Sequence, residues 1–369
     1  MRVCYLADAP YIHTRRWVQY FAGLGWETDV ISFRPAEIEG SHVHYVGGWE
    51  RLGKLRYLVH ARRVRRLVRD LQPDLVHALH VTSYGFLAAL AGVHPCIVSA
   101  WGTDILQAPR LSPFHWLITR YALSRADHVT ATGARLAEAT LNYVPKGKSV
   151  TVVPYGVDLQ QFRPLPRETS HDITIGSVGR LSSEKGLHYL LEAFARIAAQ
   201  QPRVRLLLAG DGPERQRLEK QALQLQIDDR VEFLGEIPHE QVPQTLARLD
   251  IFAMPSTYEG FGVAAIEAEA MEVPVVASNV YGIPDAVHDS VTGILVPPKD
   301  VSALADALLS LVTDEARRQQ MGRAAREFVS AHYSWKTNTA QMEALYKEML
   351  AGGNRLPSTT TDDPAGGLQ

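Results

Sequence analysis

Two glutamates eight residues apart, separated by a glycine-rich turn, are the residues of this chain best suited to chemistry. The segment reads Glu259-Gly260-Phe261-Gly262-Val263-Ala264-Ala265-Ile266-Glu267 and follows an apolar run that ends at Pro255. A strand, a glycine turn and a short helix in this order leave backbone N–H groups free at a helix N-terminus, where phosphate binds well. The pattern therefore predicts an anion site with a carboxylate on either side of it.

Two cations open the second half of the chain. The segment 176–186 contains a strand end, the turn glycine Gly179, and then Arg180 and Lys185 ahead of a helix. Two cations and a helix N-terminus can stabilise a diphosphate leaving group, with roughly two negative charges, without a metal ion. No Asp-x-Asp triplet, a common way of holding a divalent ion against a diphosphate, occurs in the sequence. We expect no metal site and no bound cofactor.

Other interpretations of these residues exist. Paired carboxylates also serve glycosidases, one as an acid and the other as a nucleophile or base. Glu259 and Glu267 could also be surface residues on a capped helix, and Arg180 and Lys185 could be ordinary solvated charges. The glycine turn together with the two cations favours an anionic leaving group, which needs little protonation.

The elements that would position these residues alternate between strand and helix. Short β-branched runs are mostly followed by ten or more residues of helical periodicity, which is typical of βαβ units with buried parallel strands. The predicted strands form two series, 3–6, 28–32, 75–78, 97–100, 128–130 and 150–153, then 173–178, 205–209, 231–234, 251–254, 275–277 and 294–296.

Bulk properties agree with a two-domain α/β protein. A chain of 369 residues is long for one core, and prolines and polar residues interrupt the pattern at 160–172. No apolar run approaches the length of a membrane span, and the N-terminus has no basic export signal before its first strand. We therefore expect a cytoplasmic protein, and with Cys4 and Cys96 as its only cysteines, no disulfide framework.

Taken as an ordered set, these motifs resemble the donor-binding half of retaining GT-B glycosyltransferases of the large glycosyltransferase family 4 type. The similarity extends over about 150–335. The matching segments are Tyr155-Gly156-Val157-Asp158 with Phe162, Gly179-Arg180-Leu181 with Lys185-Gly186, Gly210-Asp211-Gly212-Pro213, Phe233-Leu234-Gly235, Pro255-Ser256 with Glu259-Gly260-Phe261-Gly262, Glu267-Ala268, Pro274-Val275-Val276-Ala277, and Gly293 with Leu295-Val296.

The resemblance implies a GT-B architecture, in which two Rossmann-like domains with parallel sheets face a cleft between them. It implies an acceptor domain at 1–165, a nucleotide-sugar donor domain at 166–332, and a crossover helix at 333–351 that returns to the first domain. The tail, 352–369, is rich in Gly, Pro, Thr and Asp and is predicted to be disordered.

The resemblance also implies roles for single residues. Arg180 and Lys185 would bind the nucleotide diphosphate, Glu259 would hold donor-sugar hydroxyls, and these three are the predicted catalytic residues. Glu267 would accept hydrogen bonds from the ribose hydroxyls. The remaining predicted donor contacts come from the two glycine turns, at Gly179, Gly260, Phe261, Gly262 and Val263.

The first half departs from the family pattern at the cleft. Trp101 stands where many relatives have a histidine, and Trp cannot accept a proton, although it can stack on a sugar face. Asp104 and His13 are further candidate contacts, but Trp101 could equally be a core aromatic and Asp104 a helix N-cap. Glu272 stands where many relatives have a glycine that can end a helix.

Charge is unevenly distributed along the chain. Residues 1–160 hold 18 Lys and Arg against 12 Asp and Glu, a balance of +6, whereas the remainder holds 20 against 28, a balance of −8. Eight of these cations and no carboxylate fall within 51–69, with Leu58, Ala61, Val64, Val68 and Leu71 on one helical face. Such a helix could dock on anionic lipid at the inner face of a membrane, or could pack on its sheet with a solvated basic face.

The resemblance implies a retaining, metal-independent glycosyltransferase. It would move a hexosyl or N-acetylhexosaminyl group from a UDP- or GDP-sugar to a saccharide or lipid-linked acceptor, in cell-envelope glycan or glycolipid synthesis. No nucleic acid partner is expected. The alternatives are a nucleotide-sugar epimerase of the same fold, which would need an acid/base residue near the sugar, and a nucleotide-sugar-binding protein without turnover.

Overall fold

The computed structural model describes residues 1–48, 56–166 and 172–351. Arg51 and Lys54 of the basic segment, the predicted tail at 352–369, and residues 167–171 of the predicted domain boundary lie outside the described residues. The boundary itself therefore stays a prediction.

The first sheet is wholly parallel. Its seven described strands are ordered β3-β2-β1-β4-β5-β6-β7. Four of them, β1, β4, β5 and β6, are almost entirely buried on both faces, as expected for strands covered by helices on both sides. The strands are β1 (Arg2–Leu6), β2 (Glu27–Ser32), β3 (His42–Tyr45), β4 (Leu75–Leu79), β5 (Cys96–Ala100), β6 (His128–Ala131) and β7 (Thr151–Val152).

Helices cover both faces of this sheet. Val3 and Tyr5 of β1 point to a core shared with α1 (Ile12–Gly23), while Cys4 and Leu6 point to the opposite core. That opposite core receives α2 (Arg56–Leu71), α3 (Phe86–Ala91), α6 (Pro113–Arg125) and α7 (Ala134–Leu141). Shorter elements, η2 (His80–Gly85), α4 (Thr103–Leu106) and α5 (Ala108–Leu111), connect them.

The second sheet repeats the plan. Its six described strands are all parallel and ordered β10-β9-β8-β11-β12-β13. The strands are β8 (Ile173–Val178), β9 (Val204–Ala209), β10 (Val231–Gly235), β11 (Ile251–Met254), β12 (Val275–Ser278) and β13 (Gly293–Val296). The associated helices are η3 (Ser183–Lys185), α8 (Leu187–Ala198), α9 (Arg215–Gln224), η4 (Asp228–Arg230), η5 (His239–Gln241), α10 (Val242–Ala247), α11 (Val263–Ala270), α12 (Ile283–Ala286) and α13 (Val301–Thr313).

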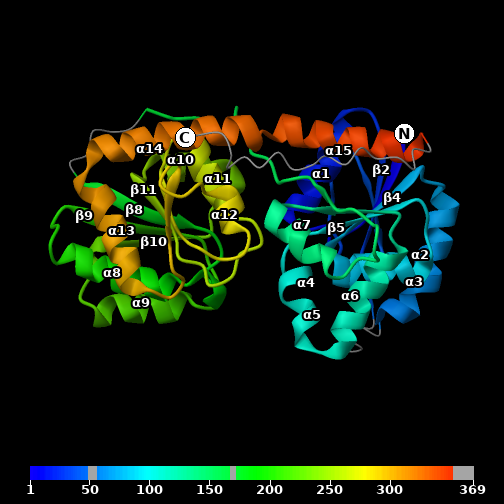
Figure 1. Ribbon diagram of the computed structural model, residues 1–369, viewed down its shortest axis with the longest axis horizontal. Coiled ribbons are helices and arrows are strands. Elements are labelled where there is room, and N and C mark those ends of the chain that lie inside the picture. The colour runs from blue at the N-terminus through cyan, green and yellow to red at the C-terminus, as the bar shows by residue number, and fades with distance from the viewer. Residues whose placement is uncertain (49–55, 167–171, 352–369) are drawn as a thin grey trace.

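Two consecutive helices join the domains along one side of the molecule (Figure 1). Helix α14 (Glu315–His332) lies over the second domain, and α15 (Trp335–Leu350) lies over the first. Met342, Leu345 and Tyr346 of α15 share a core with Val3 and Tyr5 of β1. The predicted α/β GT-B architecture, with a C-terminal helix that returns to the first domain, is confirmed.

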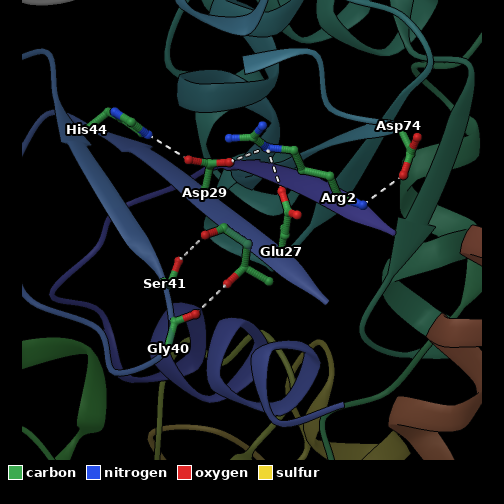
Figure 2. A network of polar contacts seen from close by, with 8 residues as sticks. Arg2, Glu27, Asp29, Gly40, Ser41, His44 and Asp74 are labelled. Atoms are coloured by element: carbon green, nitrogen blue, oxygen red, sulfur yellow. Dashed lines mark hydrogen bonds and ion pairs between the residues drawn. The ribbon is translucent and has the colours of Figure 1, made fainter. Parts of the chain in front are cut away.

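Strand β3 was not predicted from the sequence. It is a short edge strand whose residues, His42-Val43-His44-Tyr45, are exposed or half-buried, so it lacks the apolar run that marks the other strands. Figure 2 shows how side chains secure it: the buried Asp29 of β2 accepts from Arg2 Nε at 2.9 Å and pairs with His44 Nε2 at 2.7 Å. Ser41 also donates to the Thr28 carbonyl at 2.8 Å.

Helix α2 forms as predicted, but the prediction of which residues form its inner face is wrong at Leu58. Ala61, Val64 and Val68 are buried as expected, whereas Leu58 is 54% exposed. Tyr57 and His60 are buried on the inner face instead. Both pack against the Phe33 ring, at 5.4 Å and 5.3 Å, and His60 Nε2 lies 3.2 Å from the Gly48 carbonyl oxygen, so aromatic and polar contacts that an aliphatic pattern does not count set the buried face.

No helix among residues 1–48, 56–166 and 172–351 combines the length and apolar character that crossing a bilayer would require.

Candidate functional site

In each sheet the strand order places a crevice at the carboxyl ends of the strands. In the first domain the order reverses between β1 and β4, and in the second between β8 and β11. At such a point the loops after the two neighbouring strands diverge to opposite faces, which opens a site at the carboxyl ends of the strands. The two crevices contribute to one cleft.

This cleft has a volume of about 800 Å³ and is lined from both domains, a size suited to a substrate of several rings. Its first-domain wall includes loop residues after β1 and β4, and its second-domain wall includes Lys185, Glu259 and the start of α11. The lining residues used below are Asp8, Tyr11, His13, Phe33, Arg34, Arg56, Tyr57, His80, Ser83, Tyr84, Trp101, Tyr155, Glu184, Lys185, Glu259, Gly260, Phe261, Gly262 and Val263.

Lys185 and Glu259 meet in the second-domain wall. Lys185 Nζ lies 2.5 Å from Glu259 Oε2, and both side chains are largely buried. The loops that carry them are joined by the Thr257 N–H, which donates to the Glu184 carbonyl at 2.8 Å. An ammonium and a carboxylate are thus held together in the cleft by two loops that are hydrogen-bonded to each other.

The glycine turn before α11 has the predicted form. Gly262 has φ 103°, a left-handed conformation that favours glycine, and α11 begins at Val263. The N–H groups of the first helical turn have no partner within the helix. Gly260, Phe261, Gly262 and Val263 line the cleft, so these donors lie at its edge.

Arg180 is placed less deeply. It is exposed on the turn after β8 and lines a small pocket beside the main cleft, into which Lys185 also faces. The neighbouring Gly179 has φ 150°, and the chain passes so close that a Cβ built on Gly210 would lie 1.9 Å from the Gly179 carbonyl oxygen. The structure brings Arg180 and Lys185 to one pocket, as the sequence predicts.

Glu267 lies further along α11 and does not line the main cleft. Its carboxylate is buried, and Oε1 is 3.3 Å from His239 Nε2. His239 begins η5 after β10, and its ring lies 5.6 Å from that of Phe162. The sequence did not single out His239, because a loop histidine carries no spacing signal.

Trp101 belongs to an aromatic cluster in the first-domain wall. Its ring lies 5.6 Å from Tyr11, 6.2 Å from His13 and 5.9 Å from Tyr155. All four line the cleft. Trp101 is therefore neither a pure core residue nor an isolated contact, and it offers an aromatic surface on which a sugar face can stack.

His13 is the second residue of α1 and packs 4.3 Å from the ring of Tyr155. Burial, with a smaller contribution from the Arg16 cation, lowers the pKa of His13 to about 3. The imidazole is therefore neutral at physiological pH and can offer one N–H donor and one acceptor to a ligand.

Asp104 organises the loop that carries Trp101. Its fully buried carboxylate accepts hydrogen bonds from the N–H groups of Val81 at 2.7 Å, Gly102 at 2.8 Å and Trp101 at 3.1 Å. It is not among the residues that line the cleft. Because these bonds join the ends of β4 and β5, Asp104 acts as a positioning residue for the first-domain wall.

The two domains touch beside the cleft. A Cβ on Gly102 would lie 2.8 Å from the Cα of Gly260, so both glycines are required for this close approach. Asp285 of α12 also accepts from the Arg135 N–H at 3.0 Å. These contacts hold the glycine turn of the second domain against the Trp101 loop.

Several cleft residues were not identified from the sequence. His80, directly after β4, has φ 84°, a strained conformation for a non-glycine residue of the kind that gathers at functional sites. Its Nδ1 is 2.8 Å from Ser83 Oγ. Arg34 binds Asp8 through two nitrogens, one at 2.7 Å. The sequence does not reveal the backbone angle of His80, nor that Arg34 pairs with an aspartate 26 residues away.

Arg56 is the remaining cation of the first-domain wall. Its guanidinium lies 4.5 Å from the ring of Phe33 and 5.3 Å from that of Tyr57. No carboxylate among the described residues forms an ion pair with it. It stands at the N-terminus of the 16-residue helix α2, so the helix dipole adds to its positive charge.

Family comparisons identify both halves of the chain. Residues 160–328 match the model described as glycosyl transferases group 1, and residues 2–133 match the model described as glycosyl transferase 4-like.

Relatives of known name agree with these matches. The glycogen synthase of Mycobacterium tuberculosis is 30% identical over 301 residues, which cover 75% of this chain and 69% of that protein. The phosphatidylinositol N-acetylglucosaminyltransferase gpi3 subunit of Schizosaccharomyces pombe is 32% identical over 239 residues. That alignment covers 64% of this chain and 52% of the yeast subunit, so this chain spans about half of that relative's length.

A solved structure shares the fold. Sucrose-phosphate synthase from Thermosynechococcus elongatus aligns with a TM-score of 0.82 at 23% identity and covers 95% of this chain and 100% of its own. At this level of identity the likeness concerns the fold alone.

Proposed function

The chain belongs to the glycosyl transferases group 1 family and is a glycosyltransferase, and from this premise we propose a specific reaction for it. It moves a sugar from a nucleoside diphosphate donor, bound by the second domain, to an acceptor bound by the first. The observation that carries the proposal is the placement of Lys185, Glu259 and the start of α11 in one wall of the cleft between the domains.

The charges of this wall suit a nucleotide sugar. The diphosphate would lie against the N–H groups at the start of α11, with Lys185 and Arg180 as counter-charges. Glu259 would accept hydrogen bonds from sugar hydroxyls, and Glu267, beside His239, from ribose hydroxyls. Lys185 would leave its bond with Glu259 for the phosphate, which frees the carboxylate for the sugar.

The transfer is proposed to retain the anomeric configuration. The bond between the anomeric carbon and the diphosphate oxygen breaks, and a bond to the acceptor hydroxyl oxygen forms on the same face. The acceptor proton passes to the departing phosphate. Lys185, Arg180 and the N–H groups at the start of α11 would stabilise the negative charge that develops on the leaving diphosphate. The proposed reaction therefore needs no metal ion. The anomer of the product, read by nuclear magnetic resonance, tests retention.

The acceptor is proposed to carry negative charge. Arg56 stands at the first-domain end of the cleft, and no acidic partner for it occurs among the described residues. The Schizosaccharomyces pombe relative is named for phosphatidylinositol, an anionic lipid. Comparing turnover with phosphorylated and neutral acceptors tests the charge requirement.

Helix α2 is proposed to contact an anionic membrane. Arg62, Arg63, Arg66 and Arg69 are exposed on its outer face, and Arg65, also exposed, donates to the Ala91 carbonyl of α3. Clustered basic residues of this kind attract anionic headgroups. The first residues of the same helix, Arg56 and Tyr57, line the cleft. Its solvent-facing side would lie on lipid.

Lys185→Ala tests the central claim. We expect turnover to fall by about two to three orders of magnitude, because the charge acts mainly in the transition state. Turnover is read as nucleoside diphosphate release after a panel of nucleotide sugars has identified the donor by thermal stabilisation. Lys220→Ala removes an exposed lysine from α9 and is the matched control. Near-wild-type turnover in a folded Lys185→Ala variant would contradict the diphosphate assignment.

A further inference from the structure

Five large apolar side chains stand exposed on α5 and α6. Leu111 is 69% exposed, Leu117 57% and Phe114 52%, and both Trp116 and Tyr121 are 41% exposed. These five residues form what is here called the α6 ridge. It lies on the side of the first domain away from α15 (Figure 1). Single exposed apolar residues are normal on a protein surface, but a contiguous group marks an interaction site.

Packing within the chain accounts for only part of the ridge: the Tyr121 ring lies 6.1 Å from that of Phe86 in α3 and its hydroxyl donates to the Ala89 carbonyl, whereas Leu111, Phe114 and Leu117 remain more than half exposed. Ile118, Ala122 and Leu123 already form the inner face of the helix and are buried in the first-domain core. The outer face of a surface helix is normally polar. Here Phe114, Leu117 and Tyr121 recur at intervals of three and four residues, so they form an apolar stripe on the outer side.

The surroundings of the ridge are basic. Residues 108–125 contain Arg110, Arg120 and Arg125 and no carboxylate. The Arg120 guanidinium lies 4.8 Å from the ring of Trp116, so the apolar ridge and its cations are in direct contact. Helices α2 and α6 both pack on α3, which places the exposed arginines of α2 in the same layer of the molecule. In α2 the one carboxylate is Asp70, near its end.

We propose that the α6 ridge inserts into the interfacial layer of an anionic membrane, with the neighbouring arginines at the lipid headgroups. Leucine and phenylalanine would enter the acyl boundary, while Trp and Tyr favour the interface itself. Arginine can keep its charge at headgroup level while its stem covers apolar surface. Apolar burial and headgroup attraction then add, as stable peripheral binding requires.

Charge decides between a membrane and a second copy of this chain. Residues 56–69 and 108–125 together hold nine arginines and no carboxylate. Two copies joined through this face would bring like charges together, which opposes association. An anionic lipid surface is complementary to the same face.

The ridge is connected to the acceptor side of the cleft. Helix α6 packs on η2, and His80, Ser83 and Tyr84 of η2 line the cleft. Docking through the ridge would therefore hold the first-domain wall close to the bilayer surface, where a lipid-linked acceptor has its headgroup. This consequence rests on the proposed function, whereas membrane insertion itself does not depend on turnover.

Vesicle binding tests the ridge directly. Sedimentation with phosphatidylcholine vesicles, with and without phosphatidylglycerol, would compare wild type with Phe114→Glu/Leu117→Glu. We expect the double variant to bind anionic vesicles at least about tenfold more weakly, because two apolar side chains become charged. Leu223→Glu changes a leucine on α9 that is 60% exposed in the second domain, and as the matched control it should bind like wild type.

A label on the ridge reports insertion independently. Cys4 and Cys96 are buried, so Phe114→Cys offers one accessible thiol among the described residues for an environment-sensitive dye. The dye emission should shift to the blue with anionic vesicles, and the same dye at Leu223→Cys should not respond.

Distinct outcomes separate this inference from the other proposals. Vesicle binding that survives Phe114→Glu/Leu117→Glu but is lost on neutralising Arg62, Arg63, Arg65 and Arg66 would leave α2 as the docking element and overturn the role of the ridge. Self-association that the double variant abolishes, with vesicle binding unchanged, would assign the ridge to a contact between copies and also overturn it. Loss of turnover in Lys185→Ala bears on the reaction alone.

Discussion

Three glutamates of one short segment occupy three different environments. Glu259 is paired with Lys185 in the cleft, Glu267 is buried beside His239, and Glu269 is fully buried on α11. Burial raises the pKa of Glu269 well above its ordinary value, although the Thr292 hydroxyl opposes the shift. Burial without a hydrogen-bond partner for either oxygen among the described residues therefore favours the neutral acid, and Glu269 is not among the residues that line the cleft.

Glu269→Gln should stabilise the protein, and more so at higher pH. A folded-state pKa raised above the unfolded value gives stability that is present below the unfolded pKa, near 4.5, and lost as pH rises towards the folded pKa. This loss can reach about 1.4 kcal/mol per pH unit. We expect the gain in free energy of unfolding for the variant to be larger at pH 8 than at pH 5.

Urea unfolding at the two pH values measures this gain, with Glu327→Gln, an exposed position on α14, as the control. An equal gain at both pH values would show that Glu269 is not held neutral in the folded protein.

At the residue scale, the sequence predicts positions that lie at strand ends. Lys185, Glu259 and the Gly260–Gly262 turn reach the cleft because they directly follow β8 and β11, whose ends meet at the crevice. Asp104 and His80 also follow strands, β5 and β4, but their roles could not be assigned from the sequence. The task of Asp104 depends on hydrogen bonds to three backbone groups, and the prominence of His80 depends on a backbone angle.

At the element scale, apolar runs in the sequence predict buried strands well, but they do not reveal a polar strand at the edge of a sheet. The twelve strands predicted from the sequence all recur in the two sheets, whereas β3 depends on Asp29, Arg2 and His44 side chains that no local pattern reveals. Similarly, the buried face of α2 includes Tyr57 and His60, which an aliphatic pattern leaves out.

At the end of α11 a non-glycine residue adopts a backbone conformation that favours glycine. Glu272 has φ 61°, the left-handed conformation that usually belongs to glycine after a helix. An L-residue in this conformation costs about 1–2 kcal/mol, while glycine adds some entropy to the unfolded chain. The departure from the family pattern at Glu272 is therefore a real strain at this helix end.

Glu272→Gly should raise the free energy of unfolding by about 0.5–1 kcal/mol, since the strain is relieved at a smaller entropic cost. Thermal unfolding measures the shift. Glu272→Ala is the control, because alanine removes the same side chain but keeps a Cβ in the left-handed conformation. A similar gain in both variants would attribute the effect to the lost charge instead of the backbone.

At the scale of the whole molecule, α15 fixes the return of the chain to the first domain. A buried hydrogen-bond chain accompanies its apolar contacts: the Tyr346 hydroxyl lies 2.5 Å from His77 Nδ1, and the Ser99 hydroxyl lies 2.6 Å from His77 Nε2. Ser99 continues to Thr130 at 2.6 Å. Burial lowers the pKa of His77 to about 3, so the imidazole is neutral and has one donor and one acceptor for its two neighbours.

The Tyr346 hydroxyl should therefore contribute to the attachment of α15 as well as to global stability. Tyr346→Phe keeps the ring in its core but leaves one nitrogen of a buried imidazole without its partner, which costs about 1–3 kcal/mol. We expect a lower urea midpoint and faster amide hydrogen exchange in α15 than in α13, which packs wholly within the second domain. Tyr45→Phe, at a half-exposed position on β3, is the matched control. If exchange rose equally in α13 and α15, the hydroxyl would stabilise the fold as a whole, and the attachment of α15 would depend on its apolar contacts with β1.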